Sequence, residues 1–61
     1  MTLQHLQDLA VQRGDVFPRR DYGRGALAYR LGLSPEDCPP DCDSREFERG
    51  YRAQAADFYL D

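Results

Sequence analysis

Gly25-Ala-Leu-Ala-Tyr-Arg-Leu-Gly32 is the stretch that decides the fold, together with Phe47-Glu-Arg-Gly-Tyr51 further along the chain. Each segment places a glycine inside a helical pattern, where glycine costs about 1 kcal/mol relative to alanine. That cost indicates that a neighbouring backbone comes close. The repeated pattern Arg-Gly-x-x-Ala at 24–28 and 49–53 would put a notch of small residues on each of two antiparallel helices. We expect these notches to admit aromatic side chains of the partner helix against the backbone.

The first of the two helices is predicted to begin near Pro18 or Asp21 and to end at Leu31. Proline is favoured in the first turn of a helix, and Gly32 is a natural stop. Its stripe includes Tyr22, Ala26 and Tyr29. An alternative interpretation places a loop before Gly25 and starts a shorter helix there.

The last helix is predicted over residues 44–59, where the chain shows its strongest helical period. Asp43 is expected to cap it, with Glu46 completing a capping box. Residues 33–42 are expected to form a loop because its three prolines lack a backbone donor. Ser34 is expected to cap one helical turn within this loop. The apolar positions of the last helix are Phe47, Tyr51, Ala55, Phe58 and Tyr59.

An N-terminal helix is predicted over residues 3–13, with Thr2 as its cap and Gly14 as its stop. Val16 and Phe17 follow as a short apolar link beneath the fold. No segment alternates with period two, so the predicted fold class is all-α: a small helix-loop-helix hairpin with an additional N-terminal helix. The apolar stripe of this helix consists of Leu3, Leu6, Leu9 and Ala10. Through Leu3, Leu6 and Ala10 it also offers a surface for a homodimer or a partner.

The composition bounds what the chain can do. Its 61 residues, 41% of them hydrophobic, allow a single small domain with a thin core over residues 1–61. So little protein leaves no room for a deep active site, and no catalytic constellation is present, so we expect no enzyme. A charged leader and a run of about 20 apolar residues are both missing, which predicts a cytoplasmic protein without membrane contact.

The two cysteines, Cys38 and Cys42, are expected to be thiols in a cytoplasmic chain. Cys38 is interpreted as a small apolar residue that packs on the helix pair, and a redox pair is the alternative. His5 is the only histidine, so neither a metal site nor a cofactor is expected. The four tyrosines are interpreted as core residues, with stacking on RNA bases as the alternative.

The formal net charge is −3, yet all eight basic residues are arginine. Arginine binds phosphate through two parallel hydrogen bonds, which makes these residues candidate RNA contacts. Three of them follow the spacing i, i+4, i+7 and so share one face of the last helix. The alternative is a solvated surface of ion pairs such as Glu48 with Arg52. The candidate RNA-binding residues are Arg19, Arg20, Arg24, Arg30, Arg45, Arg49 and Arg52.

A spaced motif joins these segments, and it resembles the ribosome modulation factor family of small bacterial ribosome-hibernation proteins. Its members here are Gly25, Ala28, Gly32, Cys38, Pro39, Phe47, Gly50 and Tyr51. The resemblance covers residues 18–58 and leaves 1–17 as an N-terminal extension. It implies a helix-loop-helix that binds ribosomal RNA on the small subunit near the messenger path. It also implies ribosomes held in an inactive pair, and so translational repression.

The acidic run from Glu36 to Glu48 supports a second hypothesis. A surface of this charge can offer a phosphate-like pattern to a basic protein. In that case the chain is a small acidic modulator or inhibitor, encoded by a phage or mobile element, that binds a nucleic-acid-handling protein.

Overall fold

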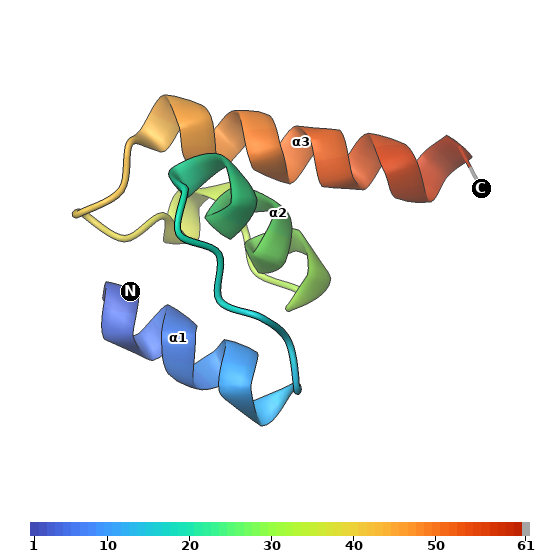
Figure 1. Cartoon of the computed structure of the whole chain (residues 1–61). Coiled ribbons are helices and arrows are strands. Elements are labelled where there is room, and N and C mark those ends of the chain that lie inside the picture. The colour runs from blue at the N-terminus through green and yellow to red at the C-terminus, as the bar shows by residue number, and fades with distance from the viewer. Residues whose placement is uncertain (61) are drawn as a thin grey trace.

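The computed structural model describes the backbone of residues 1–60 and the side chains of residues 1–57. Its elements are α1 (Leu3–Gln12), α2 (Asp21–Arg30), the 3₁₀ turn η1 (Pro35–Asp37) and α3 (Ser44–Leu60). Figure 1 shows α2 lying against α3, with α1 on the other side of α2. No strand occurs in the described backbone, which confirms the all-α hairpin with an additional N-terminal helix.

The α2–α3 crossing is built on two glycines, one from each helix. A Cβ atom added to Gly25 would overlap the carbonyl oxygen of Phe47, and one added to Gly50 would overlap that of Tyr22. The contact is therefore reciprocal. The predicted glycine-mediated packing is confirmed, but the prediction that aromatic side chains fill the notches is wrong. Backbone carbonyls fill them instead, because the helices approach more closely than a ring would allow.

The core is a single apolar cluster to which all three helices contribute. Its members are Leu6, Ala10, Leu27, Ala28, Leu31 and Phe47. Leu6 and Ala10 of α1 are fully buried within the chain, and Leu3 and Leu9 are half-buried. The stripe predicted as a homodimer surface is thus largely buried in the chain's own core. Of the apolar link, Phe17 packs against the core, whereas Val16 is 79% exposed.

The ends of α1 and α2 show which of the predicted caps and stops are present in the structure. The Thr2 hydroxyl accepts a hydrogen bond from the His5 N–H at 3.1 Å, and Gly14 adopts φ 69° after α1, as predicted. Gly32 likewise adopts φ 77° after α2. Pro18 is not in the first turn of α2, which begins three residues later. Its ring lies instead against Gly23, where an added Cβ would be 2.7 Å from the Pro18 Cβ atom.

The start of α3 departs from the predicted capping box. Asp43 Oδ1 accepts from the N–H groups of Arg45 at 2.9 Å and Glu46 at 3.4 Å, so the cap itself is confirmed. The Asp43 N–H, however, donates to Asp21 Oδ2 at 3.0 Å rather than to Glu46. A carboxylate of α2 therefore completes the cap of α3 and joins the two helix starts.

Candidate nucleic-acid interface

Arg24, a predicted RNA contact, is held inside the fold. Its Nε atom donates to the Pro18 carbonyl at 3.0 Å, and one terminal nitrogen lies 3.1 Å from Asp21 Oδ1. The guanidinium carbon also sits 5.0 Å from the ring centroid of Phe17, a cation–π contact. With its side chain only 17% exposed, Arg24 fixes the approach to α2 rather than presenting a cation to solvent.

Arg30 is also engaged within the chain. Its Nε and a terminal nitrogen donate to the two Asp15 carboxylate oxygens at 3.0 and 3.3 Å. The other terminal nitrogen donates to Gln54 Oε1 at 3.2 Å. The hydrogen bond from Arg30 lowers the pKa of Asp15 from its ordinary value. This paired geometry uses the same guanidinium edge that a phosphate would use. The predicted arginine patch is accordingly smaller than the sequence indicated.

The remaining five predicted arginines are exposed. Arg49 pairs with Glu46 at 3.1 Å, and Arg52 pairs with Glu48 at 2.6 Å, each within α3. Their side chains are still 72% and 78% exposed, and such surface pairs contribute only about 0.2–0.5 kcal/mol. No hydrogen bond or ion pair of the Arg19, Arg20 or Arg45 side chain occurs within the described part of the chain. These five cations are Arg19, Arg20, Arg45, Arg49 and Arg52.

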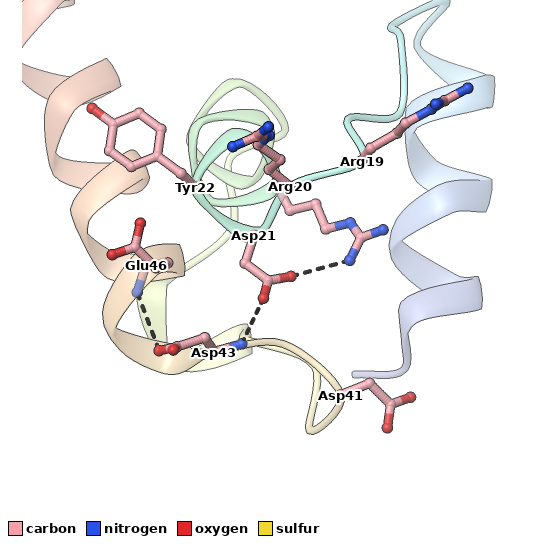
Figure 2. Close-up of a pocket in the computed structure, with 8 residues that line it drawn as sticks. Arg19, Arg20, Asp21, Tyr22, Asp41, Asp43 and Glu46 are labelled. Atoms are coloured by element: carbon pink, nitrogen blue, oxygen red, sulfur yellow. Dashed lines mark hydrogen bonds and ion pairs between the residues drawn. The ribbon is translucent and has the colours of Figure 1, made fainter.

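An open hollow lies where α2 and α3 begin. Its lining residues are Arg19, Arg20, Asp21, Tyr22, Arg24, Asp41, Asp43 and Glu46. Figure 2 shows Asp21 at its centre, joined to the Asp43 N–H. That backbone hydrogen bond is the main reason why the pKa of Asp21 lies below its ordinary value. The Asp21 carboxylate thus joins the two helix starts that line the hollow, and both arginines and carboxylates surround it.

The tyrosines divide between core and surface. Tyr29 and Tyr51 are half-buried and meet edge to face, with ring centroids 5.3 Å apart, and the Tyr51 hydroxyl donates to the Leu33 carbonyl at 2.7 Å. Tyr22 is 42% exposed at the hollow, so its interpretation as a core residue is wrong. The corresponding interpretation of Tyr59 and Phe58 concerns side chains outside those described.

Both cysteines are free thiols in surroundings that disfavour the thiolate. Burial, with Asp21 next in importance, raises the pKa of Cys42 to about 11. Burial also raises the pKa of Cys38, whose thiol donates to the Pro39 carbonyl at 3.4 Å. Cys38 packs against the core as expected. Among the described side chains, no cluster of three or more metal-ligating residues occurs.

Cys42 is therefore expected to react slowly with iodoacetamide. A pKa of about 11 leaves on the order of a hundredfold less thiolate near neutral pH than an ordinary cysteine has. Mass spectrometry at pH 8 should show Cys42 alkylated on the order of a hundredfold more slowly in the folded chain than in the same chain in urea. Equal rates in the two conditions would contradict the half-buried, Asp21-facing position of this thiol.

The eight residues of the spaced motif have structural roles, either in packing the hairpin or in ending a helix. Gly25 and Gly50 make the crossing, Ala28 and Phe47 lie in the core, and Gly32 ends α2. Pro39 is fully buried, and Cys38 and Tyr51 pack against the core. The motif therefore marks an architecture and contains none of the exposed cations.

No family model, no curated protein and no solved structure matches the chain. In the part of the chain that the structure describes, every helix is too short or too polar to cross a bilayer. Sequence reasoning missed the roles of Asp15, Asp21 and Gln54 as partners of arginine. The Asp21–Arg24 spacing of i, i+3 was a usable signal. The Asp15–Arg30 contact left none, because it joins the link before α2 to the last residue of α2.

Proposed function

We propose that this chain is a non-catalytic regulator that binds ribosomal RNA on the small subunit and represses translation by occupying that surface. The observation that carries the proposal is the set of five exposed arginines around a closely packed pair of helices that cross at two glycines. The spaced motif marks the hairpin that carries these arginines, and its resemblance to the ribosome modulation factor family is the reason for choosing the ribosome as the target. Arginine on a fixed helix face is suited to phosphate because its planar donors are already oriented.

The arginines of α3 supply the main contact in this proposal. Arg45, Arg49 and Arg52 share the exposed face of the helix, and the two ion pairs on it are weak enough for phosphate to displace the carboxylates. The molecule as a whole carries a net charge of −3, so attraction to RNA comes from this face and not from overall charge. Binding should accordingly be strong only at low ionic strength.

Co-sedimentation with small ribosomal subunits tests the proposal. If about five phosphates are contacted, affinity should fall by about two to three orders of magnitude between roughly 50 and 200 mM salt. Arg45→Ala should weaken binding and reduce the slope of log affinity against log salt by about 1. Arg13→Ala is the matched control, because Arg13 is an exposed arginine at the C-terminal end of α1, away from this helix face. A chain that never sediments with subunits at low salt would contradict the proposal.

The second candidate function, a modulator that binds a basic nucleic-acid-handling protein, has its own supporting observation. Asp41 and Glu36 are exposed, and neither side chain has an ion pair or hydrogen bond within the described residues. Free carboxylates on a chain of pI about 4.9 suit a basic protein surface. Binding that survives nuclease treatment of the subunits and is unaffected by Arg45→Ala would favour this function over the first.

A further inference from the structure

Tyr22 presents an aromatic ring to solvent from an unusually fixed backbone position. The α3 helix packs directly on its carbonyl, since a Cβ atom on Gly50 would be 2.7 Å from the Tyr22 carbonyl carbon and 3.1 Å from its Cα. The ring is nevertheless 42% exposed and borders the hollow. The backbone of Tyr22 is thus fixed while its ring stays accessible to a flat group, as in the aromatic platforms on which bases of single-stranded RNA stack.

The cations of the hollow are spread across it rather than gathered at one point. Figure 2 shows Tyr22 and Arg19 on opposite sides, with Arg20 between them. Both arginines lack a carboxylate partner in the described chain, while Arg24 beside them is engaged by Asp21 and Pro18. Separated cations of this kind match successive phosphates along a strand better than they match the single phosphate of a mononucleotide.

One carboxylate of the same hollow, that of Glu46, is placed to accept a hydrogen bond from a ligand. Figure 2 shows Glu46 on the same side as Tyr22. One of its oxygens pairs with Arg49, which leaves the other to accept a hydrogen bond. A carboxylate repels phosphate but accepts from the exocyclic amino group of a base, as it does from cytosine N4. Adenine, cytosine and guanine carry such an amino group, and uracil does not.

We infer that the hollow at the starts of α2 and α3 binds unpaired RNA and prefers bases with an exocyclic amino group. In this arrangement a base stacks on Tyr22 and donates to Glu46, while Arg20 and Arg19 contact the flanking phosphates. The inference rests on the proposed function and names the kind of RNA that this face takes. The hollow is a separate part of the surface, since its lining does not include Arg45, Arg49 or Arg52 of α3.

Fluorescence anisotropy with labelled RNA hexamers tests it on the full chain at low salt. Alternating adenine–cytosine RNA should bind about tenfold more tightly than oligouridine. Tyr22→Leu should weaken binding of the adenine–cytosine hexamer about tenfold, which is within the range for loss of one base-stacking contact. Equal binding of the two hexamers, or no loss on Tyr22→Leu in a chain with unchanged thermal unfolding, would overturn the inference.

A pair of matched variants separates base selection from charge. Glu46→Leu removes both acceptor oxygens on the Tyr22 side of the hollow, so the ratio of the two affinities should fall towards 1. Glu48→Leu makes the same change of charge and also releases an arginine, but Glu48 lies outside the lining of the hollow. It should keep the tenfold ratio. If both variants keep the ratio, the site is overturned, while salt-dependent, Arg45-dependent sedimentation with subunits would still support the proposed function.

Discussion

Gly50→Ala is expected to unfold most of the chain, although alanine is the better helix former. In a helix without a close neighbour, this change adds about 1 kcal/mol of stability. Here the new methyl group would overlap the Tyr22 carbonyl oxygen and lie 2.7 Å from the carbonyl carbon. The obstacle is backbone within a helix, so it cannot rotate away as a side chain does, and the helices must separate. A domain of this size rarely has more than about 3–5 kcal/mol to lose.

Circular dichroism during urea and thermal unfolding measures this effect. Gly25→Ala should give the same result from the other helix, because its methyl group would meet the Phe47 carbonyl. Gly14→Ala is the matched control: a Cβ there has no neighbour within 4 Å, and only its φ of 69° opposes the change, at a cost of about 1–2 kcal/mol. A Gly50→Ala chain as stable as the wild type would show that the two helices do not cross at these glycines.

The sequence predicted those parts of the fold that depend on neighbouring residues. Thr2 and Asp43 cap their helices because a side-chain oxygen there reaches an N–H two or three residues ahead. Gly32 ends α2 because it adopts a positive φ without strain. Gly25 and Gly50 could also be identified, since a glycine that weakens a helix indicates a close neighbour. These signals require no knowledge of how the helices are arranged.

Two of the predictions that failed, those on Arg30 and Tyr22, concern side chains whose neighbours lie far along the chain. Arg30 has the sequence context of an exposed helical arginine, yet Asp15 and Gln54 hold it from two other segments. Tyr22 falls on the apolar stripe of α2, yet the close helix crossing leaves room only for its backbone, and the ring turns outward. Periodicity assigns a face to a residue but gives no account of the space available on that face. The candidate site differed from the expected patch for this reason.

Periodicity also left open what α1 packs against, because an apolar stripe on a helix is equally compatible with burial in the core and with a dimer interface. The structure places Leu6 of this stripe at 0% exposure in one cluster with Leu27 and Phe47. If α1 belongs to the core, truncating this side chain must destabilise the whole chain. If it forms a dimer surface, truncation should change the oligomeric state and leave the α2–α3 hairpin stable.

Leu6→Ala is expected to lower the free energy of unfolding by about 2–5 kcal/mol, the usual cost of removing a fully buried leucine side chain. Val11→Ala is the control from the same helix: Val11 is 68% exposed, so its loss should change stability by no more than about 0.5 kcal/mol. Urea unfolding gives both values, and analytical ultracentrifugation of each variant gives its mass. A Leu6→Ala chain that unfolds like the wild type but sediments as a smaller species would show that α1 forms a dimer surface and does not belong to the core. A large loss of stability with no change in mass would instead show that α1 completes the core on which the arginine face and the Tyr22 hollow are held.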